Sequence, residues 1–186
     1  DRYLRVLGST SRALFMFHCL HQALDLARRK QPDVILVNSY WYKYHATEVA
    51  PGLYSFGAGM AFNAFMITDE GVVVMDSFDK DFAKASLEAI RKVTDKPIKY
   101  LIYSHNHYDH ISGGEVFKAE GATIVSHEAA ATWLQSHPSA DVAMPNKTWS
   151  GFKSELKVGR SQINLLYFGA NHGEGMTVFQ FPRERV

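Results

Sequence analysis

Apolar residues recur at helical spacing in several stretches of the chain. The longest stretch, residues 9–32, opens on the capping run Ser9-Thr10-Ser11 and ends at Pro32, which cannot continue a helix. We expect an amphipathic helix there, because one face of the stretch is apolar and the other is polar. The same spacing predicts helices over residues 80–93, 115–119 and 128–135.

Short runs rich in β-branched and aromatic residues alternate with these helical stretches. The early runs form hairpins, one of them closed by the turn Asp69-Glu70-Gly71, whereas the later runs are continuous apolar strands followed by helices. This order predicts a mixed α and β domain built in layers. The expected strands are 33–38, 53–56, 61–68, 71–75, 98–103, 122–126 and 178–182, with a connector at 39–45 and a loop-like stretch at 139–155, after which the chain returns to β structure.

The amino-acid composition excludes several classes of protein. With 186 residues, of which 46% are hydrophobic and 21% charged, the chain is long enough for one globular domain. A formal charge of +1 gives no electrostatic reason to bind nucleic acid, and no apolar run approaches the roughly 20 residues that cross a bilayer. The single cysteine, Cys19, excludes an internal disulfide framework and a cysteine-rich zinc site. Any metal chemistry must therefore use histidines and carboxylates, and the compartment (cytoplasmic, or processed periplasmic or secreted) stays open.

Three histidines and an aspartate lie directly after the expected strand 98–103. In extended backbone, His105 and His107 point to the same side about 6.5–7 Å apart, so both imidazoles can converge on one metal ion. Asp109 and His110 are adjacent and project in different directions, which fits a second ion better. The following Gly113-Gly114 lets the backbone turn tightly beside the cluster.

The pattern H-x-H-x-D-H followed by two glycines resembles the signature of the metallo-β-lactamase superfamily of zinc-dependent hydrolases. The likeness runs from about Val49 to the end of the chain, and it includes the strand-terminal Asp76 and a histidine, His172, in the Gly-rich turn 169–175. The resemblance implies an α+β fold, the metallo-β-lactamase-like αββα sandwich. Residues 46–186 would be its N-terminal part, C-terminally incomplete, and residues 1–45 would be an added helix and connector.

The resemblance also implies a set of metal ligands. His105, His107 and His172 would hold the first of two zinc ions, and Asp109 and His110 would begin the second site. The family completes that second site with a further aspartate and a last histidine, which this sequence does not reach. The sequence is then either a fragment of a longer protein, the interpretation we favour, or a chain whose second metal is weak or absent.

Other residues would support the site. Asp76 would fix the tautomer of an imidazole, or alternatively cap the end of its strand. Tyr108, Asn106 and Glu174 flank the ligands and are candidates for lining the pocket, although solvent-facing or supporting roles are the alternative. His127 follows a predicted strand, and we interpret it as a helix-start residue.

The activity implied by the resemblance is hydrolysis of a small ester, thioester, lactone or amide by a zinc-activated hydroxide. Asp109 would be the catalytic residue that orients the nucleophile or accepts its proton. Gly173 stands where the family usually has a hydroxyl residue, which disfavours antibiotic hydrolysis. Two alternatives stay open, a mononuclear iron dioxygenase and a non-catalytic metal-binding module. Iron or manganese could replace zinc, and the N-terminal helix could pack against a second copy of the chain.

Overall fold

A seven-stranded sheet is the largest feature of the computed structural model, which describes residues 44–58 and 61–186. β1 pairs with β2, and β3 with β4, in antiparallel fashion, whereas β4 to β7 run parallel. Parallel neighbours need crossover connections, which the helices between them supply. In sheet order the strands are β1 (His45–Ala50), β2 (Leu53–Ala58), β3 (Ala61–Ile67), β4 (Val72–Met75), β5 (Ile98–Ile102), β6 (Thr123–His127) and β7 (Lys147–Trp149).

A second, smaller sheet follows in the sequence. It contains β8 (Lys153–Val158), β9 (Ser161–Tyr167) and β10 (Thr177–Gln180), in the order β10-β9-β8 and antiparallel throughout. The connection from β9 to β10 spans residues 168–176 and carries His172. This connection matters below because it reaches the carboxyl ends of the strands of the large sheet.

Four helices lie among the described residues: α3 (Lys80–Val93), α4 (Tyr108–Ile111), α5 (Glu115–Ala119) and α6 (Glu128–Ser136). Helix α3 begins at Asp79, whose carboxylate accepts hydrogen bonds from the backbone N–H groups of Asp81 and Phe82. No described helix is both long enough and apolar enough to span a membrane.

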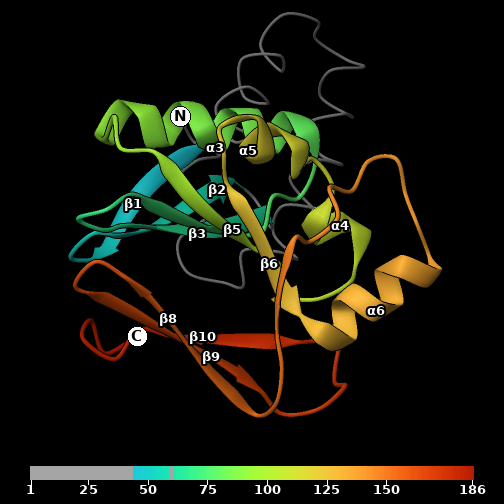
Figure 1. Ribbon diagram of the computed structural model, residues 1–186. Coiled ribbons are helices and arrows are strands. Elements are labelled where there is room, and N and C mark those ends of the chain that lie inside the picture. The colour runs from blue at the N-terminus through green and yellow to red at the C-terminus, as the bar shows by residue number, and fades with distance from the viewer. Residues whose placement is uncertain (1–43, 59–60) are drawn as a thin grey trace, which may run out of the picture. The chain divides into compact units, whose positions relative to one another are not determined.

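Alternation along the central strands explains the layers seen in Figure 1, where α3 and α5 cover one side of the large sheet and the small sheet lies on the other. In β4, Val72 and Val74 belong to the core shared with α3, while Val73 and Met75 belong to the core shared with β8 and β9. All four side chains are buried, and full burial of each such side chain stabilises the fold by about 1.5–3 kcal/mol. The described residues therefore form a helix–sheet–sheet arrangement, and the predicted layering is confirmed.

Three elements were not expected from the sequence. β1 begins inside the predicted connector and β7 lies inside the stretch 139–155 interpreted as a loop, so both interpretations were wrong there. Both are edge strands with mostly exposed residues, and they lack the apolar alternation that marks a half-buried strand. The four-residue α4 is too short to produce a helical period. The predicted helix 9–32, with the oligomer contact assigned to it, and the strand 33–38 lie outside the described residues.

The parallel part of the large sheet brings distant polar residues to one edge. Asp76 follows β4, Ser104 and His105 follow β5, and His127 ends β6. Because parallel strands end on the same side of a sheet, residues far apart in the sequence gather there.

Candidate metal centre

Three imidazoles from two loops meet at this edge. One potential ligand atom from each of His105, His107 and His172 lies within 4.8 Å of the other two, and this trio is the one such group of three among the described residues. The ring centroids are 4.5 Å apart for His105 and His107, 4.7 Å for His107 and His172, and 5.1 Å for His105 and His172. The structure thus brings together three of the five predicted ligands, including the one that lies far along the chain.

His105 is the most enclosed member of the trio. Its side chain is buried, and its Nε2 has no hydrogen-bond partner. Its Nδ1 lies 2.8 Å from the Ser104 hydroxyl, which itself donates to Asp76 Oδ2 at 2.6 Å. The serine proton is therefore already used, so His105 Nδ1–H donates to Ser104 and Nε2 keeps its lone pair. A buried imidazole nitrogen with a free lone pair fits a metal ligand.

The electrostatic surroundings keep His105 neutral. Burial is the main cause that lowers its pKa, and the positive charge of a protonated His110 is the next, while Asp76 acts in the opposite direction. Together they lower the pKa of His105 to about 4. A neutral imidazole is the form that binds a metal ion, so this residue is ready to do so at neutral pH.

His110 has a different environment. Its Nδ1 lies 3.1 Å from Asp76 Oδ2, and this hydrogen bond is the main cause that raises the pKa of His110 above its ordinary value. The ring centroid of His110 is 4.4 Å from that of His105, yet His110 does not belong to the trio. Asp109 is exposed and is also outside the trio. The structure therefore separates these two predicted ligands from the other three.

Asp76 connects His105, a member of the trio, with His110, which lies outside the trio. Its carboxylate accepts hydrogen bonds from the Ser104 backbone N–H, from the Ser104 hydroxyl and from His110. The contact with His110 is of the kind expected of a residue that fixes the tautomer of an imidazole, and the carboxylate caps the end of β5, not that of its own strand β4. Ser104 was missed by the sequence reasoning, and its position next to the first histidine is the signal that could have drawn attention to it.

The loop after β4 has a strained backbone. Asp76 and Phe78 have φ angles of +62° and +63°, a region that residues other than glycine rarely adopt. In this conformation the N–H groups of Ser77 and Phe78 both donate to the carbonyl of His110, at 3.0 and 2.8 Å. The loop thereby holds His110 by its backbone as well as by its side chain.

Gly173 brings the second loop into contact with the trio. A Cβ atom at this position would lie 2.7 Å from His105 Cδ2, 2.8 Å from Asn106 Oδ1 and 3.3 Å from His107 Nε2. Any side chain would therefore push the loop away. Asn106 is buried, and its Oδ1 accepts a hydrogen bond of 2.8 Å from the Glu174 backbone N–H. Asn106 thus supports the loop.

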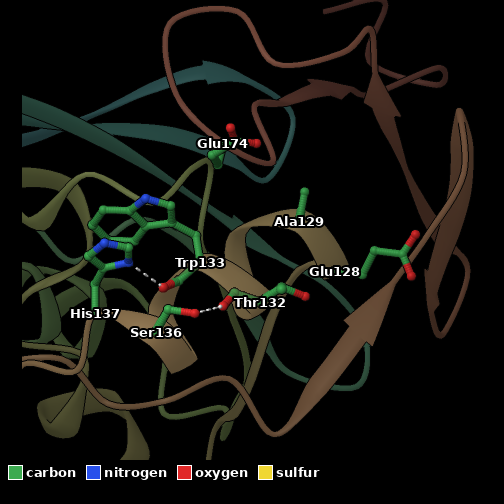
Figure 2. Close-up of a pocket in the computed structure, with 7 residues that line it drawn as sticks. All are labelled: Glu128, Ala129, Thr132, Trp133, Ser136, His137 and Glu174. Carbon is green, nitrogen blue, oxygen red and sulfur yellow. Dashed lines mark hydrogen bonds between the residues drawn. The ribbon is translucent and has the colours of Figure 1, made fainter.

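The remaining predicted residues lie around the trio. Tyr108 is exposed, and its hydroxyl donates to the His137 carbonyl at 2.8 Å. Glu174 lines a depression beside α6, as Figure 2 shows. His127 precedes α6, and its Nδ1 accepts a hydrogen bond from the Ala129 backbone N–H at 3.1 Å, which confirms the helix-start interpretation.

Comparison with known proteins identifies the class to which this fold and histidine trio belong. The metallo-beta-lactamase superfamily matches residues 59–186, well over half of the sequence. The chain belongs to this superfamily, and the resemblance inferred from the sequence is confirmed.

Individual relatives differ in what they do. Over 122 residues the chain is 31% identical to the 2,4-dinitroanisole O-demethylase subunit alpha of Nocardioides sp. strain JS1661, an alignment that covers 63% of this chain and 36% of that protein. Over 134 residues it is 30% identical to the metallo-beta-lactamase type 2 of Elizabethkingia meningoseptica, with 70% of this chain and 51% of the relative covered. The chain therefore spans between about a third and a half of the length of these two relatives.

Solved structures support the fold. A class B3 di-zinc metallo-beta-lactamase from an Alaskan soil metagenome matches with a TM-score of 0.67 at 19% identity, covering 75% of this chain and 58% of that one. A metallo-beta-lactamase from Pontibacter korlensis matches equally well, covering 76% of this chain and 68% of that one. The predicted fold class is thereby confirmed, and the histidine trio could hold a metal ion.

Proposed function

We propose that this chain carries the first metal site of a metal-dependent hydrolase that acts on a small ester, thioester, lactone or amide. The observation that carries the proposal is the gathering of three imidazoles around the buried, unpaired Nε2 of His105. Membership of the metallo-beta-lactamase superfamily supports it independently.

In this proposal His105, His107 and His172 hold zinc. When bound by three imidazoles, zinc supplies a nucleophile near neutral pH, because it lowers the pKa of water from about 15.7 to about 7. Asp109 is exposed at the first turn of α4, two residues after His107, and we assign it the proton that the nucleophile releases. With His110, Asp109 would begin a second metal site.

Asp76 and Ser104 are positioning residues in this mechanism. The Asp76 carboxylate holds a proton on Nδ1 of His110 directly, and on Nδ1 of His105 through the Ser104 hydroxyl. Both Nε2 lone pairs are then left for metal ions. A carboxylate that orients imidazoles in this way also raises their basicity, which strengthens metal binding.

Zinc binding and turnover together test the proposal. The chain, and any longer protein that contains it, would be dialysed against zinc, iron and manganese, and the bound metal measured by mass spectrometry. Activity would then be measured on matched small esters, thioesters, lactones and amides. We expect zinc to be retained and at least one substrate class to be hydrolysed.

The His107→Ala variant should lose most of the bound zinc and the activity. The matched control is His45→Ala, a change at an exposed histidine on β1 that should alter neither. Equal zinc content in the His107→Ala variant and the parent would overturn the ligand assignment. Retention of iron in place of zinc, with an iron absorption spectrum, would favour a redox enzyme, and zinc binding without turnover of any substrate would favour a binding module.

A further inference from the structure

A depression with a volume of about 420 Å³ lies along α6, where the loop between β9 and β10 passes over the helix. Figure 2 shows Glu174 reaching from that loop, across from Trp133 and His137 near the end of the helix, with Glu128 at the helix start. We call this feature the α6 depression. Its volume is within the range of small-molecule sites, about 300–1,000 Å³.

Two short stretches of chain connect the α6 depression to the metal centre. Glu174 lies two residues after His172, and a Cβ atom at Gly175 would lie only 2.6 Å from the Cβ of Ala130, so the loop rests on the helix. Tyr108 directly follows His107, and its ring lies 5.8 Å from that of Trp133. A molecule whose reactive group is at the histidine trio can therefore extend into the depression.

An aromatic pair forms one wall. The rings of Trp133 and His137 are stacked, with centroids 4.1 Å apart and an angle of 10° between the planes. His137 Nδ1 lies 2.9 Å from the Trp133 carbonyl and donates to it, which fixes the imidazole against the indole. Such a preformed wall gives up little conformational entropy when an apolar group packs against it.

The charged residues of the depression are acidic. Glu128 is exposed and Glu174 half-buried, and within the described part of the chain neither carboxylate forms an ion pair. Among residues 44–58 and 61–186, no lysine or arginine lines the depression. An indole and two unpaired carboxylates attract an organic cation, and they disfavour an anion because no cationic side chain lies there to meet it.

We propose that the α6 depression is a substrate subsite that binds a cationic group attached to an apolar or aromatic moiety, such as a benzylic ammonium. This assignment rests on the proposed function, because it takes the histidine trio to be the place where the substrate reacts. It adds the chemical class of the part of the substrate that does not react.

Direct binding tests the subsite without metal chemistry. The metal-free chain of 186 residues would be titrated with benzyltrimethylammonium, benzyl alcohol and phenylacetate, and its backbone amide shifts would be followed by NMR. We expect the cation to shift the signals of α6 and of Glu174 and to bind about threefold to tenfold more tightly than the neutral alcohol, with phenylacetate the weakest. Equal affinity for the three probes, or shifts confined to other surfaces, would overturn the proposal.

Two variants separate charge from shape. Glu128→Gln with Glu174→Gln should weaken the cation about tenfold and leave benzyl alcohol unchanged, whereas Trp133→Leu should weaken both. Glu88→Gln, a change at an exposed glutamate on α3, is the matched control and should change neither. Cation binding that survives the double glutamine change would contradict the assignment.

Turnover distinguishes this subsite from the proposed function. With zinc present, an ester that carries a trimethylammonium group should have a lower KM than its neutral isostere at similar kcat. If no ester reacts while the probes bind at α6, the proposed function fails and the subsite stands. If esters are hydrolysed with no preference for the cationic group, the hydrolase stands and the subsite fails.

Discussion

Three hydrogen bonds converge on the carboxylate of Asp76, two from Ser104 and one from His110. At the scale of single residues this carboxylate sets which nitrogen of each neighbouring imidazole carries the proton. His110 is held directly, and His105 is held through a serine hydroxyl that has only one proton to give.

Replacement of Asp76 by asparagine should therefore weaken metal binding. The side chain keeps its size and still tolerates a positive φ, but it loses the carboxylate whose hydrogen bond, and then whose charge, raise the pKa of His110. We expect zinc affinity to fall about 10–100-fold and the pKa of His110 to return toward its ordinary value. Competition with a zinc chelator and proton NMR measure the two effects. Asp95→Asn, at an exposed position, serves as the control, and unchanged affinity in the Asp76→Asn variant would exclude a positioning role.

Ser104 should behave as the link between Asp76 and His105. Ser104→Ala removes the acceptor of the His105 Nδ1–H, which allows the proton to move to Nε2, where it blocks the metal. Zinc affinity should fall about tenfold, and Ser104→Thr, which keeps the hydroxyl, should restore most of it. If alanine and threonine gave the same affinity, packing would be the role of this residue.

Proton NMR of the metal-free protein should show that the pKa values of two histidines are displaced in opposite directions from the ordinary value. His105 should stay neutral down to about pH 4, and His110 should titrate above 6.5. The neutral His105 favours folding above pH 6.5, and this stabilisation is lost as the pH falls from 6.5 toward 4. The protonated His110 favours folding below 6.5, and its contribution is lost as the pH rises through its raised pKa. Titration of His105 near 6.5 would contradict its burial.

At the scale of elements, the approach of two loops builds the trio. The loop after β5 supplies His105 and His107, and the loop between β9 and β10 supplies His172. Gly173 allows the close approach, since a Cβ atom there would lie within 2.8 Å of atoms of both His105 and Asn106.

Gly173→Ala should separate the two loops. The methyl group needs room beside His105 and Asn106, so His172 should move away and zinc affinity should fall at least tenfold. The metal-free protein should lose little thermal stability, because the loop packs few apolar side chains. Calorimetry and zinc titration measure the two quantities, with Ala170→Ser in the same loop as the control. An alanine variant that binds zinc like the parent would show that the loop has room to shift.

The local sequence pattern predicted most of the helices and strands, and it predicted two of the three histidines of the trio. Helices α3 and α5 begin and end where the apolar spacing placed them. His105 and His107 are neighbours in the sequence, so strand geometry alone brings them together. His172 could be assigned only through the family resemblance, because a contact between residues so far apart depends on how two sheets pack. The hydrogen bond between Asp76 and Ser104 joins the ends of the parallel strands β4 and β5. A local sequence pattern cannot predict which strands will be neighbours in the sheet.

At the scale of the whole molecule, the described residues hold one group of three side chains that could bind a metal ion, and Asp109 and His110, the pair predicted to begin a second site, lie outside it. The pair lacks a third ligand among the residues that the structure describes. The sheets that present these groups match those of known metallo-beta-lactamases, while the chain covers only part of each relative.

We therefore expect the isolated chain to bind one zinc ion tightly. Two ligands on an exposed turn hold a second ion far more weakly than three imidazoles of which one is buried. Equilibrium dialysis at micromolar zinc should give a stoichiometry near one, and a longer protein that adds ligands should approach two. A stoichiometry of two for the chain of 186 residues would mean that Asp109 and His110 already have a further partner.

Asp76 and Phe78, which have a left-handed backbone conformation, lower the stability of the loop that holds His110. Each non-glycine residue in that conformation costs of the order of 1–3 kcal/mol of folding free energy. Glycine would remove this cost, but at 76 it would also remove the acceptor of three hydrogen bonds, and at 78 it would remove a ring that packs against Phe82. The backbone strain at these two positions is therefore offset by contacts that their side chains make. A loop freed of this strain would lack the carboxylate that contacts both Ser104 and His110.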